Sequence, residues 1–157
     1  MSLPYQPYRG AVPPDWIDYN GHMNVAYYVL AFDRATDRLL DHLGLGEAYR
    51  QATNCSIFAL EAHICYLSEL RQGDEFAIET RLIDADRKRL HLFHAMSKTG
   101  AEEPAATLEA MALHVDLAGP KSAPIGDGPF AIIEALLREQ RRTPAPPQLG
   151  HKIGIRR

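Results

Sequence analysis

Cysteine is scarce in this chain, because only Cys55 and Cys65 occur among its 157 residues. They are ten positions apart in what reads as one extended segment, which would separate their Cα atoms by roughly 30 Å, far beyond disulfide reach. The chain also lacks the paired cysteines, or the histidine pair beside a glutamate, that indicate a metal site. We therefore expect two free thiols in a reducing compartment and no bound metal.

Long hydrophobic runs are missing as well. No stretch approaches the roughly 20 apolar residues that a membrane-spanning helix requires. The first residues, Met1 to Tyr8, contain prolines and polar groups instead of a basic patch followed by an apolar run, which argues against a secretory signal. These absences predict a cytoplasmic protein with no membrane partner.

An excess of charge of one sign is the third feature that the sequence lacks. Its 17 Lys and Arg side chains nearly balance its 20 Asp and Glu side chains, for a net charge of −3. Such a protein has no general attraction for nucleic acid or anionic membranes, so any basic binding surface would be local. With 46% hydrophobic residues, the chain predicts a single ordered domain over residues 1–157 and is too short for two.

The region from Asn24 to Leu43 has the apolar spacing of an amphipathic helix. One face is apolar and the opposite face is charged, with Tyr28, Phe32, Ala35, Leu39 and Leu43 on the first and Asp33, Arg34, Asp37, Arg38 and Asp41 on the second. Gly44 follows at a position where helices commonly end. This pattern predicts one long helix with a buried face.

The apolar period changes to two after Gly44, which is typical of strands. The predicted strands are Tyr8–Val12, Ser56–Leu67, Phe76–Ile83, Leu90–Ser97 and Pro104–Leu117. In the second of them, alternate apolar residues from Phe58 to Tyr66 predict one apolar face. Short turns between strands imply an antiparallel sheet, so we expect a two-layer α+β domain with its core at about residues 8–117.

The C-terminal part, residues 118–157, reads as an addition to this core. A Gly- and Pro-rich loop over Ala118–Pro129 precedes a predicted helix over Phe130–Arg142. A proline-rich tail over Thr143–Arg157 is expected to be irregular.

The densest group of chemically useful residues, Trp16 to Asn24, directly precedes the long helix. It places the carboxylate of Asp18 and the flexible Gly21 beside the unpaired N–H groups of a helix start. Those donors could stabilise an oxyanion while Asp18 acts on the same carbonyl group. On local chemistry alone, a role of Asp18 or Asn20 only in capping the helix is the more common case, because Asp and Asn frequently precede helices.

The pattern Asp18-x-x-Gly21-His22-x-Asn24, with Tyr28 further on, resembles the signature of hotdog-fold acyl-CoA thioesterases of the 4-hydroxybenzoyl-CoA thioesterase type. The order of predicted elements is also similar over about Tyr8 to Leu117. The resemblance implies an antiparallel sheet wrapped around a long central helix. It also implies hydrolysis of an acyl-CoA substrate without a cofactor, coenzyme A being part of the substrate.

For the site, the resemblance implies that Asp18 is the catalytic carboxylate, as general base or as nucleophile. The helix start at Asn24 and Val25 would polarise the thioester carbonyl. The chain has Val25 where families of this type often carry a second asparagine, so a side-chain hydrogen bond is lost while the backbone N–H remains.

Four separated segments carry a narrower resemblance, to betainyl-CoA thioesterases, which accompany carnitine dehydrogenase in bacterial carnitine breakdown. The segments are Trp16–Met23, Glu61–Ile64, Lys88–His94 and Leu113–Asp116. This resemblance implies a quaternary ammonium substrate, which proteins hold against aromatic faces. The candidate substrate-binding residues are Trp16, Tyr19, His22, Tyr28, Glu61, His63 and Tyr66, and we expect at least two of the four aromatic residues to be core.

Two further groups have both a functional and a structural interpretation. Glu61 and His63 would lie near the acyl pocket, or would form a polar pair at the sheet surface or at a subunit contact. The turn Arg87-Lys88-Arg89 would bind the phosphates of coenzyme A, as similar basic residues do in related thioesterases, or would be a solvated turn.

The resemblance also implies an assembly of identical chains. Related proteins are homodimers or dimers of dimers with sites between subunits.

Other functions remain open from the sequence. A general short-chain or aromatic acyl-CoA thioesterase would use the same catalytic group. A hotdog hydratase or dehydratase is a different enzyme class, but its usual histidine-containing helix motif is not visible here. A non-catalytic module that binds acyl-CoA or a quaternary ammonium would explain the basic turn and the aromatic residues without using Asp18.

Overall fold

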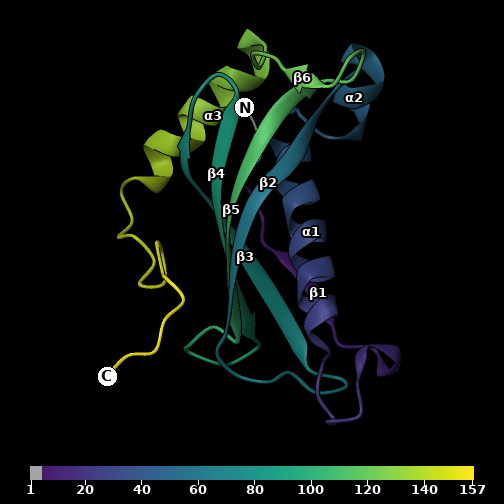
Figure 1. Cartoon of the computed structure of the whole chain (residues 1–157), viewed down its shortest axis with the longest axis vertical. Coiled ribbons are helices and arrows are strands. Elements are labelled where there is room, and N and C mark those ends of the chain that lie inside the picture. Colours follow the sequence, from purple (N-terminus) through teal and green to yellow (C-terminus); the bar gives the residue numbers. More distant parts are fainter. Residues whose placement is uncertain (1–4) are drawn as a thin grey trace.

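The computed structural model describes residues 5–157 and contains one antiparallel sheet and three α-helices (Figure 1). The strands are β1 (Tyr8–Ala11), β2 (Cys55–Tyr66), β3 (Glu75–Ala85), β4 (Arg89–Lys98), β5 (Ala106–Asp116) and β6 (Lys121–Ser122). The helices are α1 (Val25–His42), α2 (Glu47–Thr53) and α3 (Asp127–Gln140), with a short 3-10 helix, η1, over Pro14–Trp16. The strand order is β1-β3-β4-β5-β2, and β6 pairs with β5. The sheet curls around α1, which confirms the predicted hotdog fold.

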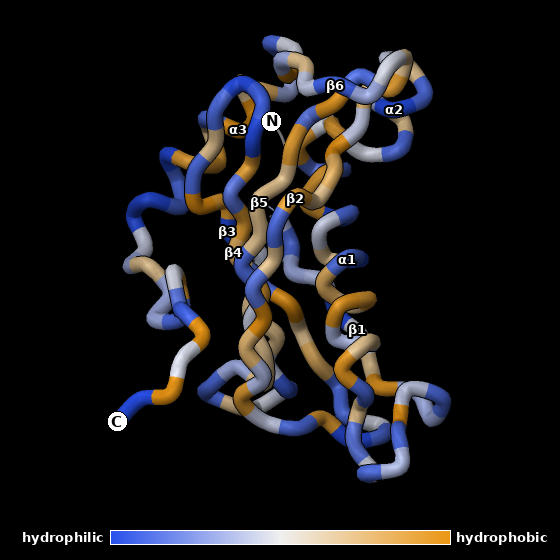
Figure 2. The backbone as a smooth tube through the Cα atoms, in the orientation of Figure 1, coloured by the Kyte–Doolittle hydropathy of each residue, from blue (hydrophilic) through white to orange (hydrophobic). Residues whose placement is uncertain are grey.

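The long helix forms where the apolar periodicity predicts it. Asn24 is its N-cap, since the side chain accepts a hydrogen bond from Ala26 N. The buried face carries Tyr28, Ala31, Phe32, Ala35, Leu39 and Leu40. Figure 2 shows hydrophobic stretches along the strands and an alternation of hydrophobic and hydrophilic stretches along α1. Burial of this face holds α1 against the sheet, because each fully buried large apolar side chain contributes about 1.5–3 kcal/mol.

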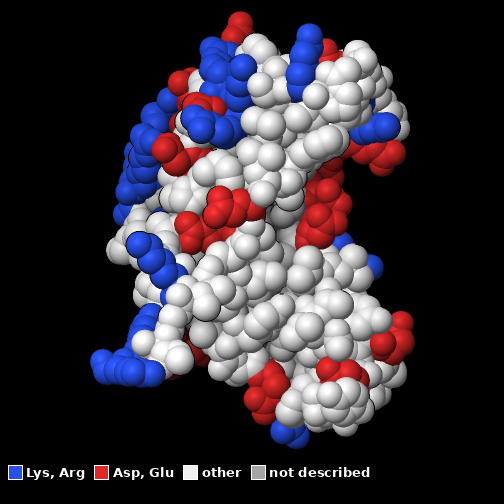
Figure 3. Space-filling view, viewed as in Figure 1, with Lys and Arg blue, Asp and Glu red and all other residues white. Residues whose placement is uncertain are grey.

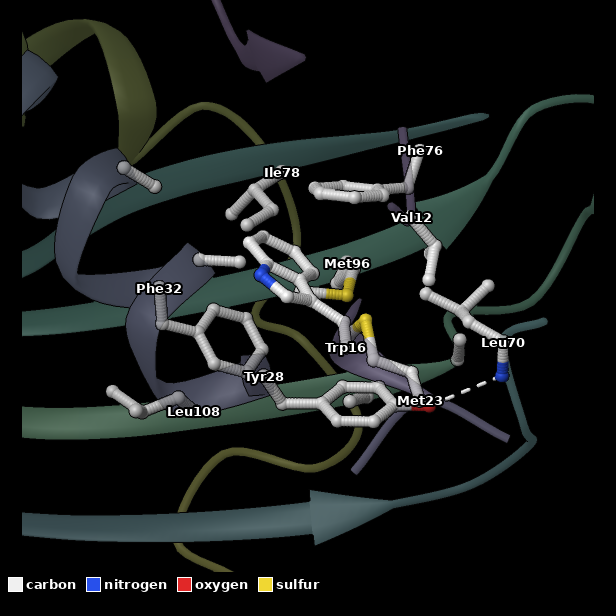
Figure 4. Packing of buried hydrophobic residues seen from close by; sticks show 14 residues of the cluster. Val12, Trp16, Met23, Tyr28, Phe32, Leu70, Phe76, Ile78, Met96 and Leu108 are labelled. Carbon is white, nitrogen blue, oxygen red and sulfur yellow. Dashed lines mark hydrogen bonds between the residues drawn. The ribbon is translucent and has the colours of Figure 1, made fainter. Parts of the chain in front are cut away.

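Two hydrophobic clusters fill the space between α1 and the sheet. In the first, Trp16 of η1 and Tyr28 and Phe32 of α1 pack with Ile78 and Met96 of the sheet (Figure 4). This cluster lies at the N-terminal half of α1 and therefore supports the segment that contains Asp18. The second cluster joins the C-terminal half of α1 to the inner face of α3.

The prediction of one apolar face for β2 is wrong. A bulge between Ala59 and Glu61 shifts the register against β5, so Ile57 and Ile64 both pack toward the core although their positions differ in parity. Phe58 and Leu60 remain 44% and 56% exposed, because β2 is the last strand of the sheet.

The structure differs from the sequence-based prediction in three places. Helix α2 occupies a segment that had no assignment, and β6 lies within the expected loop. The last helix was predicted over Phe130–Arg142, whereas α3 spans Asp127–Gln140. The tail after α3 is irregular, as predicted. It is anchored by Arg81, whose guanidinium donates to the carbonyls of Gln140, Thr143 and Pro144.

Both cysteines are free thiols. Across residues 5–157, no helix combines the length and the apolar character needed to cross a membrane.

Candidate active site

The segment before α1 forms a tight loop that presents Asp18. Ile17 and Met23 form an antiparallel bridge, and Asp18 N donates to His22 O over 3.1 Å. Gly21 N donates to Asp18 O over 2.9 Å and closes the turn. Gly21 has a φ of +79°, a backbone conformation that other residues adopt only with strain, so the glycine of the motif makes this turn possible.

The base of the loop is fixed to the core. Met23 N donates to Leu70 O over 2.7 Å, and Asn24 N donates to Trp16 O over 2.9 Å. The Trp16 ring is buried and stacks on Tyr27 with 5.1 Å between ring centroids. Trp16 therefore supports the loop from the core side, and the structure does not place it in the cavity described below.

The carboxylate of Asp18 is held by two hydrogen bonds. Oδ1 accepts from Asn20 N over 2.9 Å, and Oδ2 accepts from Asn24 Nδ2 over 3.1 Å. The other end of the Asn24 side chain, Oδ1, accepts from Ala26 N over 3.0 Å. Asn24 thus links the carboxylate directly to the first turn of α1. A carboxylate offers about four lone-pair positions, so Asp18 keeps acceptor capacity for a substrate or a water molecule.

The first amide of α1 is available to a ligand. Ala26 N donates to the Asn24 side chain and Tyr27 N to the Asn24 carbonyl. Within the described part of the chain no acceptor is recorded for Val25 N, and Val25 is exposed. A free N–H at a helix start, with the helix dipole behind it, suits a developing negative charge.

A cavity of about 340 Å³ lies in front of these groups. Its walls come from the loop before α1, the start of α1, the end of β2 and the segment that follows β2. The lining residues are Asp18, Asn20, His22, Met23, Val25, Tyr28, Tyr66, Leu67, Ser68 and Glu69. We call this cavity the Asp18 pocket.

Two tyrosine rings form the inner wall of the Asp18 pocket. Tyr28 is 3% exposed, and its hydroxyl accepts a hydrogen bond from Leu70 N over 3.1 Å (Figure 4). Tyr66 is 47% exposed, and its hydroxyl donates to Val25 O over 3.4 Å. The rings meet edge to face, with centroids 5.3 Å apart. Burial raises the pKa of both phenols above the usual value, so both hydroxyl groups are neutral at physiological pH.

The structure brings several of the predicted site residues together. Asp18, His22, Val25, Tyr28 and Tyr66 line one pocket, and Asn24 is bonded to Asp18. Tyr19, in contrast, is 97% exposed and does not line the pocket. Of the four candidate aromatic residues, Trp16 and Tyr28 are buried, which confirms the expectation that at least two belong to the core.

Glu61 and His63 do not line the Asp18 pocket. They line a second cavity, of about 310 Å³, together with His91 and Glu109 of the neighbouring strands and His151 of the tail. His91 Nε2 and Glu109 Oε1 are 2.8 Å apart there. Within one chain, the structure therefore does not bring Glu61 or His63 to the Asp18 pocket.

The basic turn lies at the other end of the sheet. The segment before β3 contributes Glu69 to the Asp18 pocket, whereas Arg87 and its neighbours follow the last residue of β3. The eleven residues of β3 span roughly 35 Å. Blue side chains gather at this upper end of the molecule in Figure 3. One chain alone thus does not bring the basic turn to its own pocket.

Two of the three cations in the turn already have acidic partners. Arg87 pairs with Asp127 over 2.7 Å and lies over the Phe130 ring. Arg89 pairs with Asp86, and the hydrogen bonds to this carboxylate lower its pKa to about 2. Lys88 Nζ contacts only the Ser122 hydroxyl among the described residues, over 3.4 Å, so Lys88 is the cation most available to a ligand.

Sequence reasoning missed Glu69, which faces the same pocket as Asp18. Hydrogen bonds from its own backbone and from Arg71, together with the nearby His22, hold the pKa of Glu69 below the usual value. Glu69 lies in the segment between β2 and β3, outside every motif. No sequence signal links it to Asp18, because only the fold brings the two segments together.

A curled antiparallel sheet around a central helix, with a carboxylate held at the helix start, defines a hotdog-fold thioesterase. Comparison with known families agrees, since the model of the Thioesterase-like superfamily matches residues 12–153. The chain belongs to this superfamily, and the prediction of a hotdog thioester hydrolase is confirmed.

Two curated relatives extend along nearly the whole chain. A betainyl-CoA thioesterase of Pseudomonas aeruginosa is 42% identical over 155 residues, which are 99% of this chain and 98% of that protein. An L-carnitine dehydrogenase/betainyl-CoA thioesterase of Agrobacterium fabrum is 38% identical over 97% of this chain. The match covers 31% of that longer protein, so the chain spans about a third of its length.

Solved structures of other proteins share the fold of this chain. Protein SAV2348 from Staphylococcus aureus, solved in complex with CoA, is 32% identical with a TM-score of 0.90, and 99% of each chain is covered. A 1,4-dihydroxy-2-naphthoyl-CoA thioesterase from Synechocystis shares the fold, with a TM-score of 0.74 at 16% identity over 83% of this chain and 96% of that one. The resemblance of the sequence motifs to hotdog-fold acyl-CoA thioesterases, and to betainyl-CoA thioesterases in particular, is therefore confirmed.

Proposed function

We propose that this protein hydrolyses betainyl-CoA to betaine and free coenzyme A in the Asp18 pocket. The observation that carries the proposal is the juxtaposition of the Asp18 carboxylate with the free Val25 amide in one cavity at the start of α1. The betainyl part rests on the 42% identity to a betainyl-CoA thioesterase over nearly the full length of both chains.

The proposed reaction uses groups of the chain and one water molecule. The thioester carbonyl oxygen accepts a hydrogen bond from Val25 N, which stabilises the negative charge that develops during attack. In the general-base route, Asp18 takes a proton from water while the water oxygen bonds to the carbonyl carbon. The carbon–sulfur bond then breaks, and the proton moves to the departing thiolate, which leaves the acid and the thiol.

Asp18 can also act as the nucleophile. Its oxygen then bonds to the carbonyl carbon, the carbon–sulfur bond breaks, and the thiolate leaves. Water hydrolyses the resulting anhydride, and a proton from this water passes to the thiolate, which restores the Asp18 carboxylate. The two routes differ in whether oxygen from water can enter Asp18. After a single turnover in ¹⁸O-labelled water, label in the Asp18 carboxylate identifies the nucleophilic route, because the general-base route labels the acid alone.

We also propose that two copies associate through β2. Strand β2 has one unpaired edge and exposes Phe58 and Leu60, and Leu67 is exposed directly after it. A long edge strand with exposed apolar side chains is normally covered. A second β2 that pairs antiparallel with it would extend the sheet. The predicted homodimer, or dimer of dimers, would bury this surface.

Such a dimer would give the basic turn a function. The first residues of β2 lie at the end of the sheet that carries the turn, since Ser56 pairs with Val115 and His114 N donates to Lys88 O. The last residue of β2, Tyr66, lines the Asp18 pocket. Antiparallel pairing would therefore bring the turn of one copy toward the pocket of the other, where Lys88 could bind the phosphates of coenzyme A.

The proposed function is tested by thiol release from a panel of acyl-CoA esters, including acetyl-, butyryl-, benzoyl- and betainyl-CoA. We expect betainyl-CoA to give the highest kcat/KM of the panel. A preference for another ester would identify a general short-chain or aromatic thioesterase. Binding of the esters without any thiol release would identify a non-catalytic module and contradict the proposal.

A further inference from the structure

The Asp18 pocket contains a second carboxylate, Glu69, which the reaction described above does not use. We propose that Glu69 and the ring of Tyr66 together bind the quaternary ammonium group of the substrate and determine its selection. This inference rests on the proposed function and adds a specificity-determining residue to it.

The covalent structure of the substrate restricts where its cation can lie. In a betainyl thioester one methylene group separates the nitrogen from the carbonyl carbon, which places these atoms roughly 2.5 Å apart. A carbonyl group held between Asp18 and Val25 therefore keeps its cation inside the same cavity. Glu61, which faces the second cavity, does not line this one, and Glu69 is the acidic residue besides Asp18 that does.

The aromatic contact is supplied by Tyr66. Tyr28 is almost completely buried, whereas Tyr66 is partly exposed to the pocket. The Tyr66 hydroxyl donates to Val25 O and the Tyr28 hydroxyl accepts from Leu70 N, which holds the two rings in place, so binding requires little reorganisation. A fixed aromatic face suits a trimethylammonium group, which has no N–H and therefore cannot form a conventional hydrogen bond.

The charge of Glu69 is available to such a ligand. The pKa of this carboxyl group lies below the usual value, so it is ionised at neutral pH. Its contact with Arg71 is long, 3.5 Å, and joins two exposed side chains. An exposed pair of this kind is weak, so the carboxylate can turn toward a bound cation. Asp18 remains free for the chemical step, because a separate carboxylate attracts the charge.

The test compares two esters of equal shape. In 3,3-dimethylbutyryl-CoA a neutral carbon replaces the charged nitrogen, so packing is nearly identical and a difference in kcat/KM reports the electrostatic contacts. We expect the unmodified protein to prefer betainyl-CoA by about 10- to 150-fold. Glu69→Gln keeps the shape of the side chain, and we expect it to reduce this preference about 2- to 5-fold.

Two further variants separate the contributions. Tyr66→Leu removes the ring and is expected to lower the preference about 3- to 30-fold, whereas Tyr66→Phe keeps the ring and most of the preference. Glu134→Gln makes the same chemical change on the exposed surface of α3 and serves as the matched control. The preference of this control should equal that of the unmodified protein.

The measurements distinguish a failure of the proposed function from a failure of the role of Glu69. If the unmodified protein hydrolyses neither ester, or hydrolyses both equally, the betainyl proposal fails and this inference fails with it. If the unmodified protein prefers betainyl-CoA while Glu69→Gln keeps the full preference, or lowers both rates equally, only the role of Glu69 is overturned.

Discussion

Asn24 makes hydrogen bonds through both ends of its side-chain amide, one to the carboxylate of Asp18 and one from the backbone of Ala26. A serine at this position can still cap α1, but its shorter side chain cannot also donate to Asp18. We therefore expect Asn24→Ser to change the free energy of unfolding by less than about 0.5 kcal/mol. The rate constant kcat should fall about 10- to 100-fold, because the carboxylate loses its orientation.

Asn24→Ala is the companion variant for that measurement. It removes the cap and the donor together, so the same loss of kcat should be accompanied by destabilisation of about 1 kcal/mol in urea unfolding. A serine variant with full kcat would mean that the bond to Asp18 is structural only.

Lys88 is the second residue with a separable role. We expect Lys88→Gln to raise KM for coenzyme A esters and to weaken the dependence of KM on salt, with kcat nearly unchanged. The reason is that the phosphates of coenzyme A lie far from the reacting carbonyl group. Lys88 would therefore bind them equally in the ground state and in the transition state. Steady-state kinetics at several salt concentrations measure this effect, with Lys152→Gln in the exposed tail as control. An unchanged KM would identify a solvated turn.

Strand β2 is the element that the proposed assembly depends on. A charge in the middle of its apolar edge should prevent a second copy from pairing, so we expect Leu60→Glu to shift the protein toward the monomer in analytical ultracentrifugation. Ile155→Glu adds the same charge at an exposed apolar residue of the tail and should leave the mass unchanged. If the Leu60 variant keeps the mass of the unmodified protein, the interface lies elsewhere.

Periodicity predicts an element only when tertiary packing repeats along it. Helix α1 has a continuous buried face and was predicted almost to the residue. Helix α2 has no fully buried residue, so its seven residues carry no periodic signal. The bulge in β2 depends on the pairing with β5, and the sequence of β2 alone does not reveal it.

The residues of the candidate site also differ in whether a local pattern or the tertiary fold brings them together. Asp18, His22 and Val25 come from one short segment, and a local motif is enough to group them. Glu69 joins them only through the fold, and Glu61 is separated from them although its strand ends at the pocket. The residues that a motif places correctly are therefore those whose geometry is set by one loop.

On the scale of the whole molecule, a buried histidine makes stability depend on pH. His94 lies between Thr80 and Thr36, with 2.9 Å from Nδ1 and 3.1 Å from Nε2 to the two hydroxyls. Burial lowers its pKa from 6.5 to about 4, because the core disfavours the charged ring. The unfolded chain therefore binds a proton at His94 between these two pH values, whereas the folded chain does not.

The sign of the effect follows from this difference. The contribution of His94 to stability is complete above about pH 6.5 and is lost as the pH falls toward 4, by about 2–3 kcal/mol in total. Urea unfolding at pH 7.0 and pH 4.5 measures the loss. In His94→Gln, which has no titrating ring, the difference between the two pH values should be smaller by that amount. An equal difference in both proteins would assign the pH dependence to other groups.

The central claim is that Asp18 carries out the hydrolysis. Asn is isosteric with Asp and retains the loop, but it is neither a base nor an oxygen nucleophile of useful strength. For Asp18→Asn we predict a fall in betainyl-CoA hydrolysis of at least about 100-fold, with little change in the melting temperature. Asp15→Asn, an exposed neighbour in η1, should retain full activity. An Asp18→Asn variant that folds and keeps most of its thiol release would contradict the account.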